Sequence, residues 1–307
     1  MTRGFQFLQL IIYILVFQQY STAQQTPSFS DYNYNALLIN PAEAGYFPQT
    51  DITLTNRGYL NQFEGSARTL GVLMNSSLRS EKLGLGLGVM YDEIGVTTTS
   101  FISGSLSYKI NLDHNYNRVR WWSYNPSVLS FGITAGVALY NEDLLALGID
   151  NDPNFAANID TAVPVIGAGI RFNREHIFIG VSAPNLLGDT LSNENNLNLE
   201  RPWYLNAGYR FFATRFQEVL ITPSVLLKYV VGAPLQFDFN TIINYKNKFE
   251  VGGGYRTDTS INLLAGFYMF DSWRIVYSYN QTTRNTPINN THGFVLSYRF
   301  NNGFKKS

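Results

Sequence analysis

The sequence predicts an all-β fold, a transmembrane antiparallel β-barrel of about 14 strands with an N-terminal signal peptide and an extended periplasmic arm. Three observations predict it: many aromatic but few charged residues, repeated alternation of apolar and polar positions, and an apolar N-terminus. Aromatic residues make up 15% and charged residues 14% of the 307 residues, whereas a soluble domain typically carries about 25% charged residues. The composition therefore excludes a disordered chain.

Charge and cysteine content exclude further classes. The 22 Lys+Arg residues balance 22 Asp+Glu residues, and there is no cysteine. A chain without net charge lacks the electrostatic basis for general nucleic-acid binding, so we expect no nucleic-acid partner. Disulfides and thiolate metal sites are excluded, and the three histidines have no partners at ligand spacing. No nucleophile–base pattern is found either, so we expect no catalytic residue, no metal, no cofactor and no enzyme activity.

The N-terminus has the layout of a secretory signal peptide. Arg3 precedes an apolar run over 5–17, and Ser21 and Ala23 supply small residues for cleavage. The run is too short for a comfortable membrane span, although a single-helix anchor is the alternative. We therefore expect cleavage near Ala23 and a location in the cell envelope. The expected division of the chain is 1–23 signal peptide, 24–50 extended N-terminal arm, 51–301 outer-membrane β-barrel and 302–307 C-terminal tail.

Alternation of side chains predicts the strands. In 291–300, Phe294, Leu296 and Tyr298 share one face, whereas Ser297 and Arg299 lie on the other. Similar patterns predict an even number of strands, about fourteen, as is usual for a bacterial barrel. The predicted strands are 51–59, 68–78, 83–91, 97–110, 127–139, 162–172, 176–184, 203–213, 218–230, 234–245, 249–257, 260–270, 273–280 and 291–300.

A soluble sandwich would bury the apolar faces of these strands, whereas a barrel turns them toward lipid. The signal peptide and the last strand, which closes on Phe300, favour the barrel. So do aromatic residues near strand ends, where interfacial girdles would lie. They are Tyr91, Tyr108, Tyr140, Trp203, Tyr229, Tyr245, Tyr255 and Tyr279.

The lengths of the connections give an independent test. If both termini are periplasmic, every second connection should be a tight turn. Five such positions are short (79–82, 173–175, 214–217, 246–248 and 271–272), and long connections fall in the opposite set (141–161, 185–202 and 281–290). The connection 111–126 breaks the rule, because it is long where a periplasmic turn is expected. This insert is basic and aromatic, so Arg118, Arg120, Trp121 and Trp122 are the candidate periplasmic contact.

Several motifs resemble a known family. The arm reads Gln-Thr-Pro-Ser-Phe-Ser-Asp-Tyr over 25–32 and Asn-Pro-Ala-Glu-Ala-Gly over 40–45. Further blocks follow in order, among them Asn-Arg ending at Arg57, Asp-Glu-Ile-Gly over 92–95, and Ser-Tyr-Arg-Phe over 297–300. This series resembles the PorP/SprF family of Bacteroidetes outer-membrane proteins across the whole mature chain. The matching positions of interest are Asn40, Pro41, Ala42, Gly45, Arg57, Asp92 and Gly95.

The resemblance implies an outer-membrane role in the type IX secretion system and the gliding motility linked to it. It implies export or surface attachment of secreted adhesin-like proteins, with periplasmic and outer-membrane components of that system as partners besides the membrane lipid. The alternative is a passive porin or a FadL-like hydrophobic-solute channel of similar strand count. The resemblance leaves open whether the chain belongs to the core apparatus or to a substrate-specific branch.

Three features within the expected barrel have competing interpretations. The segment 40–45 is interpreted as a turn that delivers the arm into the first strand or plugs the barrel, with a docking surface as the alternative. Charges in strands should face inward or lie at a rim, where they pair across the lumen or form an eyelet for a solute. These are Arg57, Asp92, Glu93, Asp238, Arg256, Arg274 and Arg299. The glycines at 84, 86 and 88 are interpreted as small lumen-facing residues, not as a phosphate loop.

Overall fold

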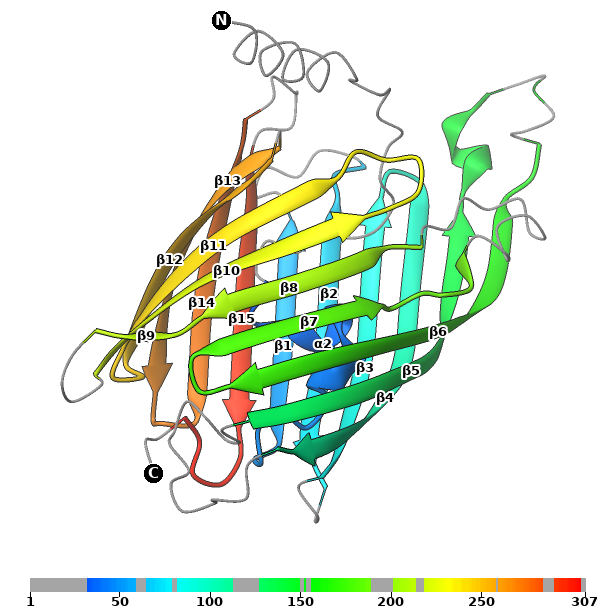
Figure 1. Ribbon diagram of the computed structural model, residues 1–307. Helices are drawn as coiled ribbons and strands as arrows, with labels where there is room; N and C mark the ends of the chain where they lie inside the picture. Colours follow the sequence, from blue (N-terminus) through cyan, green and yellow to red (C-terminus); the bar gives the residue numbers. More distant parts are fainter. Residues whose placement is uncertain are drawn as a thin grey trace, which may run out of the picture.

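One antiparallel sheet, curved until its ends meet, forms the body of the molecule (Figure 1). The computed structural model describes residues 32–58, 65–78, 82–112, 127–149, 152, 156–188, 201–213, 218–257, 259–283 and 290–304. In the described part of the chain, no helix is long and apolar enough to cross a membrane.

The strands follow the chain in order around the barrel. They are β1 (Asp51–Gly58), β2 (Arg68–Ser77), β3 (Leu83–Ile94), β4 (Thr97–Asn111), β5 (Ser127–Glu142), β6 (Ile159–Arg174), β7 (Ile177–Ala183), β8 (Trp203–Tyr209), β9 (Phe211–Phe212), β10 (Val219–Tyr229), β11 (Gln236–Tyr245), β12 (Phe249–Arg256), β13 (Ser260–Met269), β14 (Trp273–Thr282) and β15 (Asn290–Arg299).

The sheet closes because β15 pairs with β1, from Arg299 opposite Asp51 to His292 opposite Gly58. The segments β8 and β9 both pair with β10 in one continuous register, so together they are a single strand. The break between them lies beside Pro223, which has no N–H to donate to the ladder. The barrel therefore has 14 strands, and the sequence prediction of a barrel of about this size is confirmed.

The alternation of side chains accounts for the two faces of the wall. Along β3, Leu87 and Val89 are exposed on the outside, whereas Gly86 and Gly88 are buried on the inside. Phe294 and Phe300 likewise point outward, with Ser297 fully buried between them. An apolar outer face of this kind suits hydrocarbon, and the small and polar inner face leaves room in the lumen.

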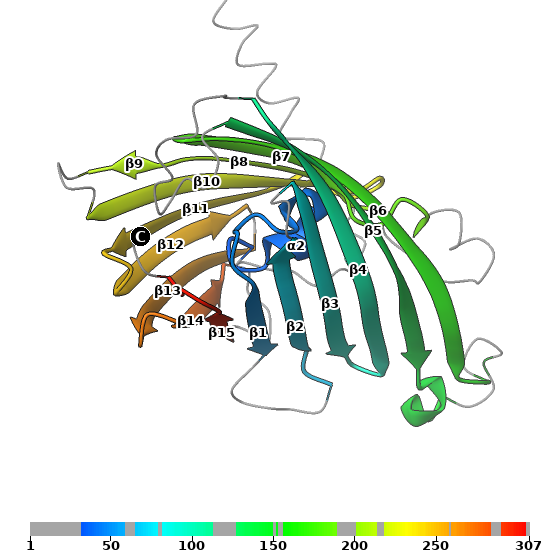
Figure 2. The same ribbon diagram turned by 90° about the horizontal axis from the view of Figure 1, so that it is seen from below.

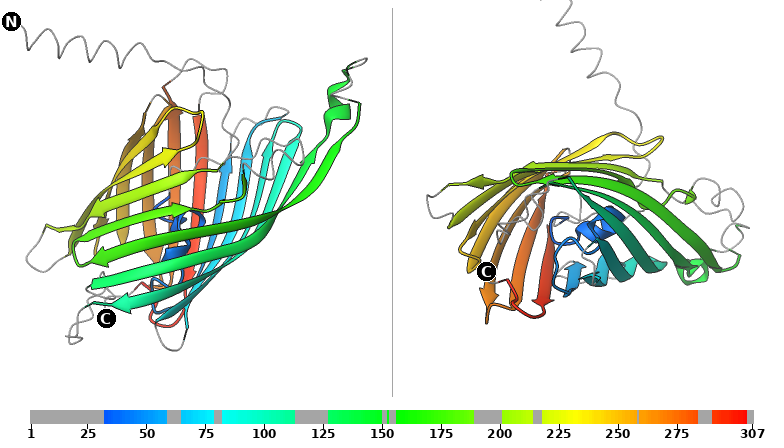
Figure 3. Two further views of the ribbon diagram at one scale, coloured as in Figure 1. Left: turned by 45° about the vertical axis from the view of Figure 1, so that its right-hand side comes forward. Right: turned by 60° about the horizontal axis from the view of Figure 1, so that its bottom comes forward.

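The two rims of the barrel differ. At the rim that carries Asp51 and Arg299, called the turn end here, the hairpins 246–248 and 271–272 are as tight as predicted, with positive φ at Lys246, Asn247, Phe270 and Asp271. Each hairpin leaves three residues between its paired strand ends, and two successive residues with positive φ match the right-handed twist of the flanking strands. The opposite rim, the loop end, carries a long β5–β6 hairpin with a 3₁₀ turn η2 (Leu144–Leu147), which projects beyond the neighbouring strands (Figure 3).

The N-terminal segment folds inside the barrel (Figure 2). The sequence predicts an extended arm over 24–50, but in the described residues from 32 onward the chain forms α2 (Ala36–Ile39) and the 3₁₀ helix η1 (Pro41–Glu43). Asn40 starts η1, because its side chain accepts a hydrogen bond of 2.9 Å from the N–H of Ala42 and Pro41 fits a first helical position. Residues 32–47 are called the plug below.

Candidate functional site in the barrel lumen

Glycines of the wall let the plug approach the sheet closely. A Cβ at Gly132 would overlap the backbone of Pro41, and one at Gly84 would overlap the backbone of Ala44. Gly86 faces Leu37 in the same way, because a Cβ at Gly86 would lie 2.7 Å from the Leu37 side chain. The alternating glycines of β3 therefore form part of a seat for the plug, which agrees with their interpretation as small lumen-facing residues.

Side chains of the wall satisfy carbonyl groups of the plug. The Ser182 hydroxyl donates to the Ile39 carbonyl at 2.8 Å, and the Ser107 hydroxyl donates to the Ala44 carbonyl at 2.6 Å. The Lys109 ammonium donates to the Gly45 carbonyl. Asn40 reciprocates, because its amide donates to the Ile170 carbonyl at 3.2 Å. A short helical segment leaves many backbone groups unpaired, and here the barrel supplies the partners.

A buried ion pair ties the plug to β6. The Arg171 guanidinium pairs with the Glu43 carboxylate, and both side chains are almost inaccessible to solvent. Arg210, from the break between β8 and β9, donates to the Tyr46 hydroxyl at 3.0 Å. The Phe178 ring lies between the two arginines, 4.9 Å from the Arg171 guanidinium and 5.0 Å from that of Arg210. Removing one partner of such a pair costs about 3–5 kcal/mol, because the other charge stays buried.

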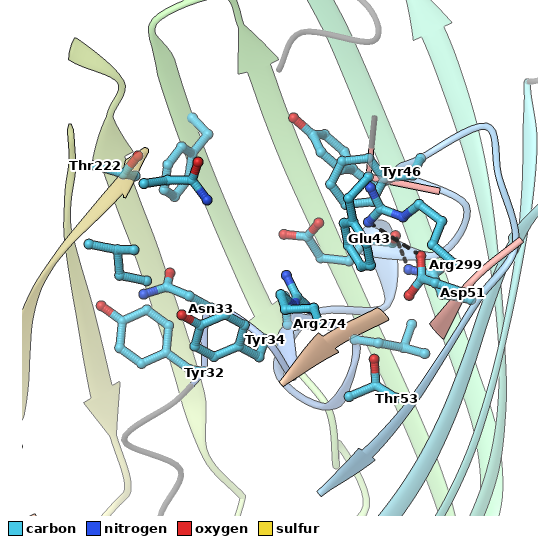
Figure 4. A pocket seen from close by; sticks show the side chains of 18 of the residues that line it. Tyr32, Asn33, Tyr34, Glu43, Tyr46, Asp51, Thr53, Thr222, Arg274 and Arg299 are labelled. Atoms are coloured by element: carbon cyan, nitrogen blue, oxygen red, sulfur yellow. Dashed lines mark hydrogen bonds and ion pairs between the residues drawn. The ribbon is translucent and has the colours of Figure 1, made fainter. Parts of the chain in front are cut away.

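On the opposite wall, arginines alternate with aromatic rings. The Arg274 guanidinium lies 4.7 Å from the Tyr34 ring and 5.1 Å from the Phe304 ring. The Arg299 guanidinium lies 4.2 Å from the same Phe304 ring and 3.8 Å from the Phe47 ring. Figure 4 shows Arg274 beside Tyr34 and Arg299 beside Asp51. This arginine–aromatic stack joins the plug to the C-terminal tail. Burial in the stack raises the pKa of the Tyr34 hydroxyl well above its ordinary value.

The tail reaches the stack by folding back into the turn end. Gly303 has φ +62, and a Cβ there would overlap the Asp271 carbonyl. The Phe304 N–H donates to that carbonyl at 2.6 Å, and the Asn247 amide donates to the Phe304 carbonyl at 2.8 Å. Phe304 is 7% exposed as a result. The last described residues of the chain thus lie against the lumen instead of trailing from the last strand.

The plug separates two cavities of different character. The turn-end cavity, about 290 Å³, is lined by charged side chains that include Arg171, Arg210, Arg274 and Arg299. The loop-end cavity, about 140 Å³, is lined mostly by apolar side chains, among them Leu37, Leu38, Met90, Phe101 and Tyr140. The described lumen is therefore divided into a compartment that carries charged side chains and one lined mostly by apolar side chains.

The structure separates the family-motif residues into two groups. Asn40, Pro41, Ala42 and Gly45 lie in the plug and contact the wall. Arg57, Asp92 and Gly95 lie toward the loop end: Gly95 takes φ +62 in the β3–β4 hairpin, and Asp92 accepts a 2.5 Å hydrogen bond from Thr69. Arg57, opposite Thr69 in the ladder, donates to Thr291 at 3.4 Å.

The predicted contact residues Arg118, Arg120, Trp121 and Trp122 lie outside the described residues.

The charged residues of the strands face the lumen or lie at a rim, as expected from the sequence. Arg256 and Asp238 form a buried pair at 2.6 Å, and Arg299 lies 3.7 Å from Asp51. Asp92 is buried, whereas Glu93 at the rim accepts a hydrogen bond from Tyr91. The assignment of Tyr140 to the outer girdle is wrong, because its ring lines the loop-end cavity and packs on Val163.

Several residues of this site have no counterpart among the sequence predictions. They are Ser107, Lys109, Arg171, Ser182, Arg210 and Phe304. Alternation alone could have found four of them, because Ser107, Lys109, Arg171 and Ser182 occupy positions that face the lumen in their strands. The others depend on contacts with the plug or with the folded-back tail.

In the described residues, no group of three or more His, Cys, Asp or Glu side chains is placed to hold a metal ion. Comparison with known proteins gives one family: the profile described as "Type IX secretion system membrane protein PorP/SprF" matches residues 21–300. No curated protein sequence matches the chain.

Solved structures with a similar fold are outer-membrane proteins of low sequence identity. Omp33 of Acinetobacter baumannii is 9% identical, with a TM-score of 0.45 over 82% of this chain and 98% of its own. The toluene transporter TbuX of Ralstonia pickettii is 11% identical, with a TM-score of 0.48 over 93% and 100%. A mutant of the monoaromatic hydrocarbon channel TodX is 10% identical, with a TM-score of 0.49 over 86% and 94%.

Proposed function

Because the chain belongs to the PorP/SprF family of type IX secretion system membrane proteins, we propose that it supports export or surface attachment of adhesin-like secreted proteins. It acts through protein–protein contacts and has no enzymatic role. The mature protein begins near Gln24, after cleavage at Ala23, with the arm over 24–50, the barrel over 51–301 and the tail over 302–307. N-terminal sequencing of the protein purified from outer membranes tests the cleavage site.

The observation that carries this proposal is the plug. A passive porin needs a continuous aqueous path, whereas here residues 32–47 cross the lumen and are held by a buried ion pair and by hydrogen bonds to their backbone. A scaffold that works through its rims needs no such path. The plugged lumen therefore favours a scaffold over a passive porin. A FadL-like hydrophobic-solute channel needs no aqueous path and is the remaining alternative.

The insert 111–126 is our candidate for the periplasmic contact. Its ends, Asn111 of β4 and Ser127 of β5, lie at the turn end, which also carries the tight turns, the first residue of β1 and the last residue of β15, as on the periplasmic side of bacterial barrels. The N–H of Leu112 donates to the Ser127 carbonyl at 2.9 Å and closes the base of the insert. Lys109 on the same strand holds the Gly45 carbonyl, so the insert begins directly beside the plug.

Removal of 115–124 tests this contact. We expect the shortened protein to reach the outer membrane and to lose surface display of the secreted adhesin-like protein. A quadruple variant of Arg118, Arg120, Trp121 and Trp122 to Ala should have the same effect. Its matched control changes Asn115, Asn117 and Ser123 of the same insert to Ala and should leave display unchanged. Normal display by the quadruple variant would reject the contact.

Planar bilayers test the scaffold against the passive channel. We expect the purified wild-type protein to show no stable open conductance, and deletion of its gene to impair secretion. Steady conductance of the wild type, together with normal secretion after deletion of the gene, would establish the channel instead.

A further inference from the structure

The loop-end cavity is an apolar well whose floor is the plug. Leu37 and Leu38 of α2 form part of the floor, and Met90, Phe101 and Val165 stand on the inner walls of β3, β4 and β6. Its volume is about 140 Å³. An engineered protein cavity of about 150 Å³ lined by Leu, Ile and Phe stays free of water and binds benzene. The size and lining of the well therefore suit one aromatic ring.

An apolar well is out of place in the lumen of an outer-membrane barrel, where the inner face is normally polar. The turn-end cavity follows that rule, with four arginines on its lining. On the side of the plug that faces the loop end, Leu37 and Leu38 are partly exposed to the lumen. Elsewhere the plug buries its apolar side chains, such as Ile39 and Ala44. Covering these leucines with an apolar ligand would remove that surface from water.

The well also has polar groups, which are Ser103, Ser105, Thr134 and Asn185 on its lining and a polar pair at one edge. Asp92 and Thr99 are cross-strand neighbours on β3 and β4, and both lie on the lining. Asp92 is 6% exposed, and among the described residues its carboxylate accepts a hydrogen bond from Thr69 at 2.5 Å and interacts electrostatically with Arg57. An ionised carboxylate has about four acceptor positions, so it can take a further donor from a ligand. A ligand with an apolar ring and a hydroxyl or N–H group at one end would match both parts of the well.

We propose that the well is a binding site for a small single-ring aromatic molecule that carries a hydrogen-bond donor, a phenol in the simplest case. The ring lies between the plug and the walls at Met90 and Phe101, and the donor faces Asp92. Because the plug closes the floor, the molecule enters and leaves from the loop end. The well then acts as a binding pocket, and its ligand does not depend on the proposed role in export.

The probe for the test is 4-fluorophenol, followed by ¹⁹F NMR with the full mature protein in nanodiscs. Met90→Trp fills the well, and Val89→Trp places the same ring on the lipid-facing side of the same strand. We expect saturable binding to the wild type and to Val89→Trp, and affinity at least tenfold lower for Met90→Trp. Asp92→Asn should lower the affinity for 4-fluorophenol severalfold and leave the affinity for fluorobenzene unchanged.

A second pair of variants keeps the test decisive if Met90→Trp fails to fold. Val165→Phe fills the well from β6, whereas Ile166→Phe points outward from the next position. The folded state of each variant is checked by its shift on unheated electrophoresis gels. Equal binding by the filled and outward variants, or only the non-saturable uptake that empty nanodiscs show, would overturn the proposal. Binding of fluorobenzene and 4-fluorophenol with equal loss in Asp92→Asn would reject the role of the carboxylate.

Discussion

The two sides of the plug contact the barrel wall through different chemistry. Toward β3–β7, the plug backbone lies against glycines and receives hydrogen bonds from Ser107 and Ser182. Toward β14 and β15, its aromatic side chains Tyr34 and Phe47 lie against Arg274 and Arg299. On the first side, the plug backbone fits against glycines where a single added Cβ would overlap it. On the second side, aromatic rings stack on guanidinium groups of long side chains, which can change rotamer and keep contact. The plug therefore has a fixed seat on one side and an adjustable contact on the other.

The largest effect on opening of the plug should follow from breaking the ion pair between Glu43 and Arg171. Glu43→Gln leaves the Arg171 guanidinium buried without its partner. We expect the closed state to lose about 3–5 kcal/mol, which shifts the equilibrium toward open barrels by more than about a hundredfold. Single-channel recordings of the purified protein measure the open fraction. Glu218→Gln, which removes an exposed ion pair at the turn end, is the control and should stay closed.

A substitution that needs space in the seat should have the next largest effect. Gly132→Val places side-chain atoms where the Pro41 backbone lies, and overpacking of this kind typically costs about 1–3 kcal/mol. We expect open events that the wild type lacks, together with faster proteolysis of the plug. Gly104→Val on β4 is the matched control, because a Cβ there meets only the Leu87 side chain at 3.7 Å. If both variants behave alike, the glycine seat does not hold the plug.

The adjustable side should respond more weakly. Phe304→Ala removes the ring shared by Arg274 and Arg299, and a cation–π contact contributes about 0.5–2 kcal/mol, depending on its exposure. We expect open events roughly tenfold more frequent than in the wild type, but rarer than in Glu43→Gln. Phe270→Ala changes an exposed ring at the same rim and should have no effect. A Phe304→Ala protein as open as Glu43→Gln would contradict the difference between the two sides.

The smallest effect concerns the rim outside both contacts. A hydrogen bond from Lys246 to Glu218 raises the pKa of that lysine above its ordinary value. Its stabilising contribution is therefore present below the ordinary lysine pKa and disappears as pH rises through the raised value. NMR titration of Glu218→Gln should show the Lys246 pKa moving down toward the ordinary value, with no change in plug opening. An unchanged lysine pKa would show that the pair does not form in solution.

The fold could be predicted from the sequence because each strand carries its own signal. A period of two residues needs no knowledge of distant contacts, and it located every strand from 51–59 to 291–300. Tyr140 shows the limit of the same signal: aromatic residues near strand ends suit a girdle, yet this one turns inward onto Val163.

The sequence located the plug only in part: plugging of the barrel was one interpretation of 40–45, but the short helices and the wall residues that hold them were not predicted. Its helices span only Ala36–Ile39 and Pro41–Glu43, too short for any periodicity, and their partners lie on strands far along the chain. The pairing of Glu43 with Arg171 joins residues more than a hundred positions apart. The glycines at 84 and 86 were correctly expected to face the lumen, but nothing in their spacing says which segment they receive.

Arg299 has a consequence for how the finished molecule can come apart. It is the last residue of β15, lies opposite Asp51 where the final strand meets the first, and touches both Phe47 and Phe304. One guanidinium group thus contacts the β1–β15 seam of the barrel, the plug inside it and the C-terminal tail. Unzipping the first and last strands from this rim would therefore loosen the seam, the adjustable side of the plug and the tail together, while the fixed seat on β3–β7 would still hold the plug.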